Sequence, residues 1–142
     1  MRKLLIALFS GAMLTATASA EDVKIGIILG FTGPIESLTP DMAAGAELAI
    51  AEVNGGGKFM GGSKVTGIRG DSTCVDSAAA QATAERLVTS DKVNAIMGAD
   101  CSGVTGAILA NVAMANGVVM ISPSATSPGL STAEDNGLFF RT

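Results

Sequence analysis

Segments typical of a buried strand alternate with segments typical of a helix along almost the whole chain. Val23 to Leu29 is a nearly continuous run of apolar and mostly β-branched residues, as expected for a strand buried on both faces of a sheet. Further strand patterns follow at 64–69, 93–97, 118–121 and 138–141, and helix patterns separate the first four strands at 39–53, 77–89 and 102–116. Regular alternation predicts a parallel sheet with right-handed crossovers and helices on both faces. The expected fold class is therefore α/β, with a doubly wound parallel sheet.

The predicted helices carry start and stop signals. The first begins at 39–41 with a hydroxyl N-cap in Thr39, a proline and then an acid, and it runs to about Val53, where Asn54 and three glycines stop it. Its buried face is expected to comprise Ala46, Ile50 and Val53. Asp71 and Asp76 are interpreted as turn and helix-capping acids, and Gly117 follows the end of the third helix.

The first 20 residues have the pattern of a secretory signal peptide. Arg2 and Lys3 precede an apolar run at 4–14, and the small residues at 18–20 suit a signal peptidase. The run is shorter than the roughly 20 apolar residues that span a bilayer, and an acidic pair follows it at once. No cysteine lies near the cleavage point, so a lipid anchor is not indicated. We expect export, with cleavage after Ala20.

Export affects how Cys74 and Cys101 are interpreted. In an oxidising compartment, a small and even number of cysteines favours a disulfide. The alternatives are two buried free thiols, or a metal-binding pair whose other ligands are missing.

The composition argues against several classes of function. Lys and Arg number 9 against 13 Asp and Glu, and an acidic surface repels phosphate backbones, so no nucleic acid partner is expected. The chain has no His, which removes Ser-His and Cys-His nucleophile pairs and His metal ligands. Gly26, Gly30 and Gly33 lack the dinucleotide-binding spacing, and the residues around Ser102 do not form a nucleophile elbow. We therefore expect no catalytic residue, no metal site and no cofactor.

Three loops rich in Gly, Ser and Thr follow strands and therefore share the carboxyl edge of the predicted sheet, where open α/β sheets bind ligands. They cover residues 32–39, 100–105 and 122–129. Ser102 and Gly103 open a helix, and a helix N-terminus favours an anion such as a carboxylate. The alternative is that Ser102 only caps its own helix. Ser124 and Thr126 offer hydroxyls between two prolines, although such a segment can also be a plain surface turn.

These segments together resemble the periplasmic Leu/Ile/Val-binding protein family, the solute receptors of branched-chain amino acid ABC importers. The similarity covers essentially all of 23–142. The matching stretches, in order, are VKIGIILGFTGP, AAGAELAIAEVNGGG, GDSTCVDS, VNAIMGADCSGVT and MISPSATSPGLS, followed by FFRT. The resemblance implies a type I periplasmic binding protein with two α/β lobes joined by a hinge. Residues 21–142 would be an incomplete first lobe, because the chain stops within a strand pattern, and the second lobe would be absent from this chain.

The resemblance also implies the site residues. Cys74 and Cys101 match the family's disulfide. Ser102 matches the serine that binds the ligand carboxylate, Ser124 a residue whose carbonyl receives the ligand ammonium, and Thr126 one whose amide and hydroxyl bind the carboxylate. The candidates for pocket wall are Leu38, Gly103 and Ala125. Leu38 stands where many amino acid binders have an aromatic residue. Asp100 is unusual beside the pocket serine, and it could either meet a cation or cap the helix.

The function that the resemblance implies is binding, with no catalysis. A monomeric periplasmic receptor would hold a branched-chain or related amino acid by its carboxylate and ammonium groups and deliver it to the permease subunits of an ABC importer. One alternative is a ligand-sensing domain of the same fold in a receptor or regulator. Another is a secreted α/β hydrolase or oxidoreductase.

Overall fold

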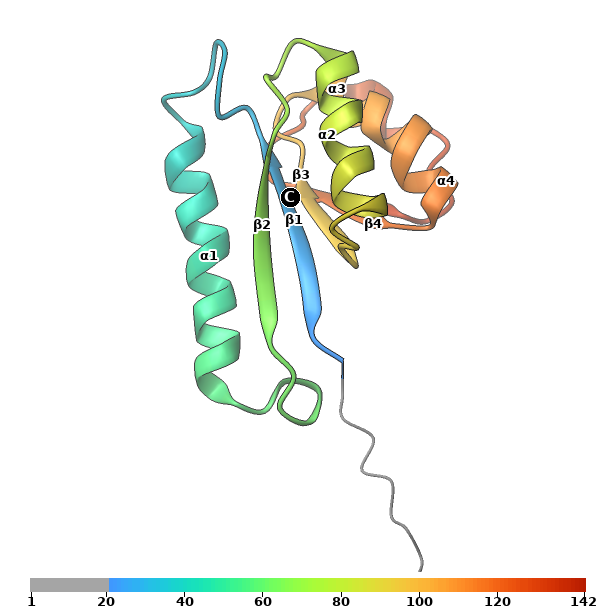
Figure 1. The fold of residues 1–142 in the computed structure, drawn as a ribbon. Coiled ribbons are helices and arrows are strands. Elements are labelled where there is room, and N and C mark those ends of the chain that lie inside the picture. Colours follow the sequence, from blue (N-terminus) through green and yellow to red (C-terminus); the bar gives the residue numbers. More distant parts are fainter. Residues whose placement is uncertain (1–20) are drawn as a thin grey trace, which may run out of the picture.

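The computed structural model describes residues 21–142, and the predicted signal peptide at 1–20 lies outside the described residues. The described chain forms one five-stranded sheet in which every strand pairs in parallel, in the order β2-β1-β3-β4-β5 (Figure 1). The strands are β1 (Val23–Leu29), β2 (Val65–Asp71), β3 (Ala95–Gly98), β4 (Val119–Ser122) and β5 (Phe139–Arg141). The sequence therefore predicted the fold class and all five strands correctly.

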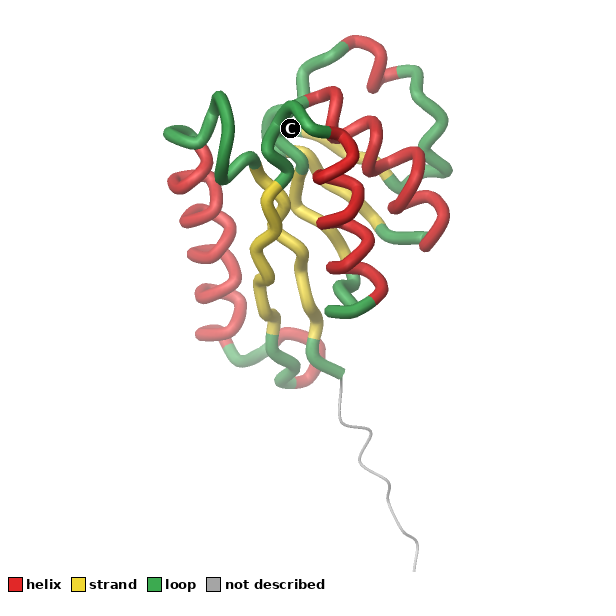
Figure 2. The backbone as a smooth tube through the Cα atoms, turned by 45° about the horizontal axis from the view of Figure 1, so that its top comes forward, coloured by secondary structure: helices red, strands yellow, loops and turns green. Residues whose placement is uncertain are grey.

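The helices lie on both faces of the sheet. Figures 1 and 2 show α1 (Thr39–Gly56) on one side, and α2 (Ser77–Thr89) with the helical segment at 102–116 on the other. The chain passes from β1 to its neighbour β2 through α1, and then returns through α2 to β3 on the opposite side of β1. The direction of winding therefore changes between β1 and β3. In doubly wound sheets a crevice opens at the carboxyl ends of the strands at such a point.

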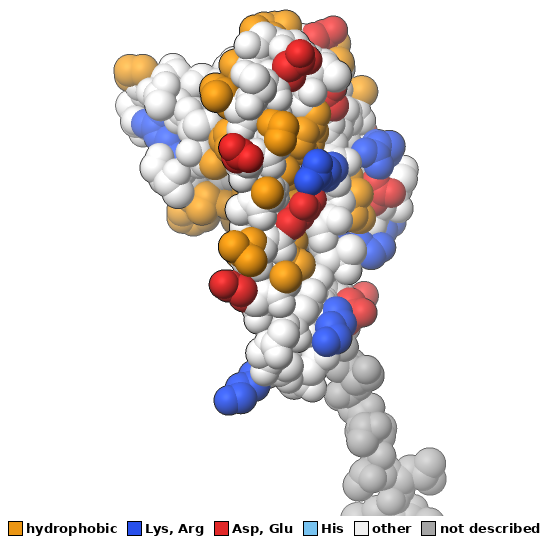
Figure 3. Space-filling model, turned by 90° about the vertical axis from the view of Figure 1, so that its left-hand side faces the viewer, with side chains coloured by type: hydrophobic (Ala, Val, Ile, Leu, Met, Phe, Trp, Pro, Cys, Tyr) orange, Lys and Arg blue, Asp and Glu red, His pale blue; other side chains and the backbone are white. Residues whose placement is uncertain are grey.

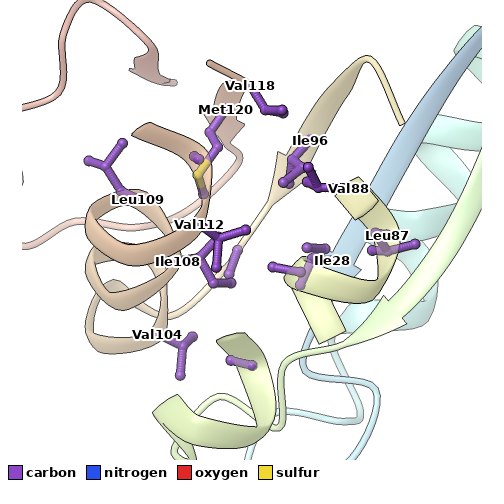
Figure 4. Close-up of a cluster of buried hydrophobic side chains, with 14 of the residues drawn as sticks. Ile28, Leu87, Val88, Ile96, Val104, Ile108, Leu109, Val112, Val118 and Met120 are labelled. Carbon is purple, nitrogen blue, oxygen red and sulfur yellow. The ribbon is translucent and has the colours of Figure 1, made fainter. Parts of the chain in front are cut away.

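Two apolar clusters hold these layers together. The larger lies between the sheet and the helices α2 and 102–116, and Figure 4 shows its side chains converging from both layers. Its fully buried members include Ile28, Leu87, Ile96, Ile108 and Met120. The smaller cluster lies beneath α1 and contains Ile27, Leu29 and Ala43. Successive residues of β1 from Ile27 to Leu29 enter opposite clusters, which explains why this end of the strand is apolar without interruption.

Helix α1 departs from the prediction at both ends. Leu38, rather than Thr39, is the N-cap residue. Thr39 is fully buried, and its hydroxyl donates to the Gly30 carbonyl 3.1 Å away instead of accepting from a helix amide. At the other end the helix continues to Gly56, and Gly57 closes it in the left-handed conformation. The predicted cap is therefore wrong because Thr39 bonds back to the end of β1.

The buried face of α1 was predicted only in part. Ala46 and Ile50 pack against the smaller cluster, as expected, together with Met42. Val53 is instead 40% exposed, because the last turns of the helix extend beyond that cluster. Figure 3 shows the α1 side of the molecule, where apolar side chains are scattered among charged ones.

The third helical segment is continuous from 102 to 116 but changes its hydrogen-bonding pattern on the way. An α-helical start, α3 (Ser102–Ile108), leads into a π-helical stretch, η2 (Leu109–Ala113), and a last turn, α4 (Met114–Asn116). Gly117 ends the segment in the left-handed conformation, as its sequence predicts. The apolar pattern did not reveal the π-helical stretch.

The sheet face that α1 packs on is only half covered. Ile27, Met97, Ile121 and Phe140 are register partners across four neighbouring strands, so their side chains share this face. Ile27 is fully buried, whereas Ile121 is 43% and Phe140 54% exposed. Within residues 21–142, the part of the sheet formed by β4 and β5 therefore presents apolar side chains to solvent on this face.

Candidate ligand-binding site

The ends of β1 and β3 approach each other closely at the point where the winding changes. Gly98, the last residue of β3, has a φ of +135°, and a Cβ atom there would lie 2.0 Å from the Ile28 carbonyl oxygen. Only glycine fits this position, because any side chain would collide with the backbone of β1. The close approach brings Asp100 and the start of α3 to the carboxyl end of β1.

Ser102 is the first residue of α3, and Cys101 is the N-cap residue. The Ser102 hydroxyl oxygen accepts a hydrogen bond from the Ser127 amide at 3.0 Å. It therefore joins the helix start to the loop after β4 rather than capping its own helix, and its hydrogen remains available for a ligand oxygen. The amides of Ser102 and Gly103 lie in the first turn, where a helix supplies no internal acceptor. A Cβ atom at Gly103 would meet nothing within 4 Å, so the space on the side-chain side of Gly103 is open.

The loop after β4 is held by its own serines. Ser122 is fully buried, and its hydroxyl accepts from the Ala125 amide at 2.9 Å. Ala125 is itself buried, so this candidate wall residue supports the loop from within. The Ser124 hydroxyl donates to the Asp100 carbonyl at 3.0 Å, and it therefore does not point to a ligand.

Thr126 is an exposed residue of this loop. Within residues 21–142, neither its amide nor its hydroxyl makes a hydrogen bond, although the neighbouring amides of Ala125 and Ser127 do. On the next strand, Arg141 donates to the carbonyls of Ala125 and Ser127 at 3.1 and 2.8 Å. The backbone on both sides of Thr126 is thereby fixed while its own polar groups stay free.

A disulfide joins Cys74 to Cys101, with 5.2 Å between their Cα atoms. The predicted pairing is confirmed, and the structure leaves neither cysteine as a free thiol or a metal ligand. The bond connects the loop after β2 to the residue immediately before Ser102. Within residues 21–142, no group of three or more His, Cys, Asp and Glu side chains could hold a metal ion.

The loop at 32–39 is hydrogen-bonded to the end of β2, but its candidate wall residue, Leu38, lies away from Ser102. The Thr32 hydroxyl donates to Asp71 at 2.5 Å, and the Thr73 amide donates to the same carboxylate at 2.9 Å. Leu38 stands at the start of α1 and is 62% exposed. The connection that carries Leu38 lies on the α1 side of the sheet, and α3 begins on the opposite side (Figures 1 and 2). The structure therefore brings together Ser102, Gly103, Ser124, Ala125 and Thr126, and it places Leu38 across the rim from them.

Two opposing effects act on the pKa of Asp71. Partial burial is the larger single effect and raises the pKa, but hydrogen bonds from the Thr32 hydroxyl and from the amides of Thr73, Thr32 and Phe31 together outweigh it. The net result is a pKa below the ordinary value for an aspartate. Asp71 is therefore a turn residue, as the sequence predicted, because it accepts from the Thr73 amide. It also fixes the loop at 32–39 through its hydrogen bonds with Thr32.

Asp100 does not cap α3, so the capping role predicted for it is wrong. No ion pair within residues 21–142 involves Asp100. Its carboxylate instead accepts from the amides of Gly30 and Cys101 and from the Ser72 hydroxyl. Sequence reasoning missed this network, and also Arg141, because Gly30 and Ser72 lie 70 and 28 residues from Asp100, and Ser127 lies 14 residues from Arg141. The one signal in the sequence was the position of an acidic residue, Asp100, close to the candidate ligand-binding Ser102.

Comparison with known proteins agrees with this arrangement. A family model described as periplasmic binding protein matches residues 22–142. The Leu/Ile/Val-binding protein of Escherichia coli is 33% identical over 125 residues, which cover 88% of this chain and 33% of that protein. A branched-chain amino acid transporter substrate-binding protein from Streptococcus pneumoniae, solved with isoleucine, has a TM-score of 0.75 at 34% identity and covers 84% of this chain and 33% of its own.

An ABC transporter substrate-binding protein from Desulfitobacterium hafniense, solved in complex with Leu, has a TM-score of 0.69 at 28% identity and covers 86% of this chain and 34% of its own. This chain thus spans about a third of the length of these three proteins. Within residues 21–142, every helix is too short or too polar to cross a membrane. The match of the family model over 22–142 assigns the chain to the periplasmic binding protein family.

Proposed function

We propose that this chain forms part of a periplasmic receptor that binds a branched-chain or related amino acid and holds its carboxylate group between Ser102 and Thr126. The observation that carries the proposal is that two groups of hydrogen-bond donors without acceptors in the described chain belong to segments that are bonded to each other. The first-turn amides of α3 and the free amide and hydroxyl of Thr126 are joined through the hydrogen bond between Ser127 and Ser102.

A carboxylate suits these donors on electrostatic grounds. The helical segment that begins at Ser102 runs to Asn116, and its N-terminus carries a partial positive charge. Hydrogen bonds to a charged oxygen are stronger than those between neutral groups, so an anion gains most from this position. The carbonyl of Ser124 would receive the ligand ammonium group, because the Ser124 hydroxyl is already engaged with Asp100.

The biological role follows from the family. One relative named above is a Leu/Ile/Val-binding protein, and the two solved structures are a branched-chain amino acid transporter substrate-binding protein with isoleucine and an ABC transporter substrate-binding protein with Leu. We infer export through the predicted signal peptide, action in the periplasm as a monomer, and delivery of the bound amino acid to the permease subunits of an ABC importer. No catalytic step is part of this function.

Isothermal titration calorimetry tests the proposal on the mature protein expressed from its complete gene. We expect leucine, isoleucine or valine to bind, and leucinamide to bind far more weakly because it lacks the carboxylate charge. A protein that binds none of the three amino acids, or that binds leucinamide as tightly as leucine, would contradict the proposed carboxylate site.

A further inference from the structure

Asp100 is a buried carboxylate that the proposed binding site does not use directly. Only 4% of the residue is exposed. Its Oδ2 accepts from the Gly30 amide at 2.8 Å, and its Oδ1 accepts from the Cys101 amide at 2.9 Å and from the Ser72 hydroxyl at 3.2 Å. These three donors follow β1, β3 and β2, so one side chain ties together the ends of three neighbouring strands.

The backbone carbonyl of Asp100 is hydrogen-bonded to the loop after β4. The Asp100 carbonyl accepts from the Ser124 hydroxyl at 3.0 Å. Through its side chain Asp100 therefore fixes the amide of Cys101, immediately before Ser102, and through its carbonyl it fixes the loop that carries Thr126.

The chemistry of the three donors requires a carboxylate. An ionised aspartate only accepts hydrogen bonds, and its two oxygens have room for three donors. An asparagine has one acceptor oxygen and would turn an NH₂ group toward one of these donors. A leucine would leave two buried amides and a hydroxyl without acceptors, which is costly in a protein interior. No cation among the described residues pairs with Asp100, so its place in the interior depends on these hydrogen bonds.

We propose that Asp100 is a positioning residue that sets the geometry of the carboxylate site by joining the start of α3 to the loop after β4. This inference rests on the proposed function. The donors on Ser102 and Thr126 belong to different segments, and they can share one carboxylate only if their separation is held constant. Without the Asp100 carboxylate, the amides of Gly30 and Cys101 lose their acceptor. The start of α3 can then shift relative to the loop after β4. Asp100 itself does not touch the ligand.

Asp100→Asn is the variant that tests this role, and the readout is the ratio of leucine to leucinamide affinity in the mature protein expressed from its complete gene. General damage to the fold lowers binding of both compounds alike, whereas a displaced carboxylate site lowers only the preference for leucine. We expect the ratio to fall about tenfold, the scale of one hydrogen bond to a charged group. Ser72→Ala, which removes one donor and keeps the Asp100 charge, should lower the ratio in the same direction by less.

Asp71→Asn is the matched control. Asp71 also accepts from one hydroxyl and two amides at the end of a neighbouring strand, but its partners are Thr32 and Thr73, and it bonds to neither half of the site. The ratio of leucine to leucinamide affinity in Asp71→Asn should stay within about twofold of that in the unchanged protein. Thermal unfolding of each variant confirms that it is folded before titration.

The outcomes separate the two proposals. If the unchanged protein binds leucine over leucinamide and Asp100→Asn keeps or raises that ratio, the positioning role is overturned and the proposed function stands. A raised ratio would mean that the Asp100 charge acts on the ligand only by repulsion. If the unchanged protein does not bind leucine, isoleucine or valine at all, the proposed function fails, and the positioning role fails with it.

Discussion

At the scale of single residues, Ser102 and Thr126 differ in how much of their hydrogen-bonding capacity the protein itself uses. The Ser102 hydroxyl already accepts from the Ser127 amide, whereas Thr126 makes no hydrogen bond within the described chain. Ser102 therefore has two tasks in the proposed site: it donates to the ligand, and it anchors the loop that presents Thr126. Thr126 has only the first.

This difference predicts unequal losses on substitution. Ser102→Ala removes a donor to the carboxylate and also leaves the Ser127 amide without its acceptor, so leucine affinity should fall by more than in Thr126→Ala. One hydrogen bond to a charged group corresponds to about 1.5–3 kcal/mol, or roughly ten- to more than a hundredfold in affinity. Calorimetry on the protein from its complete gene measures both, with Ser90→Ala at the exposed end of α2 as the control. Equal affinity in all three variants would place the pocket elsewhere.

Asp71 predicts a pH dependence of stability. Its pKa is lowered in the folded protein, so its hydrogen bonds add stability that is fully present above the unfolded pKa, near 3.9, and is lost as the pH falls through the lower folded value. Asp71→Asn cannot ionise. The difference in unfolding free energy between the unchanged protein and Asp71→Asn should therefore shrink as the pH falls below about 4. Urea unfolding at a series of pH values measures it, and a difference that stays constant over that range would contradict the assignment.

What the sequence could predict at this scale depended on how local the chemistry is. Asp76 was correctly assigned as the cap of α2, because a capping acid bonds to amides two and three residues away. Asp100 could not be assigned, because its partner Gly30 lies 70 residues away and comes close only when β1 and β3 pair. Ser102 and Thr126 became candidates because their loops share the carboxyl edge of the predicted sheet, and only their roles toward a carboxylate came from the resemblance to a family.

At the scale of elements, the strands were predicted better than the helix ends. β1 is apolar except for Lys24, and β3 and β4 are short, mostly apolar runs between polar loops, whereas β2 was recognised by its alternating pattern. The start of α1 was misplaced because Thr39 bonds back to Gly30, a tertiary contact that overrides the usual N-cap preference. The π-helical stretch at Leu109–Ala113 was missed because one extra residue per turn hardly alters an apolar pattern.

The disulfide ties two of these elements together and predicts a measurable contribution. It closes a loop with a sequence separation of 27 between the loop after β2 and the start of α3. The chain-entropy model assigns such a loop about 3–4 kcal/mol of stability, because the cross-link restricts the unfolded chain. The double variant Cys74→Ser and Cys101→Ser should lose about this amount in urea unfolding. Thiol titration of the denatured and unreduced protein should find no free thiol, and two free thiols would contradict the pairing.

At the scale of the whole molecule, the two faces of the sheet are covered unequally. Helix α2 and the segment 102–116 cover the face that carries Ile28, Ile96 and Met120. The opposite face has α1 alone, which lies over β1 and β2 and leaves the side chains of β4 and β5 exposed. The exposed part adjoins β5, whose outer edge has no strand partner within residues 21–142. An apolar strip next to an unpaired strand edge is a typical site of association.

This arrangement predicts that residues 21–142, expressed alone, associate through the strip formed by Val119, Ile121 and Phe140. Replacing Ile121 and Phe140 by Lys places charges on the strip and beside the open edge, and it should convert the associated species to monomer. Leu48→Lys is the matched control, because Leu48 is 61% exposed but lies on α1, away from the strip. Sedimentation velocity over a range of concentrations distinguishes the species. The double variant should remain monomeric at concentrations where the unchanged chain and the control associate, and an unchanged chain that stays monomeric throughout would show that the exposed strip does not drive association.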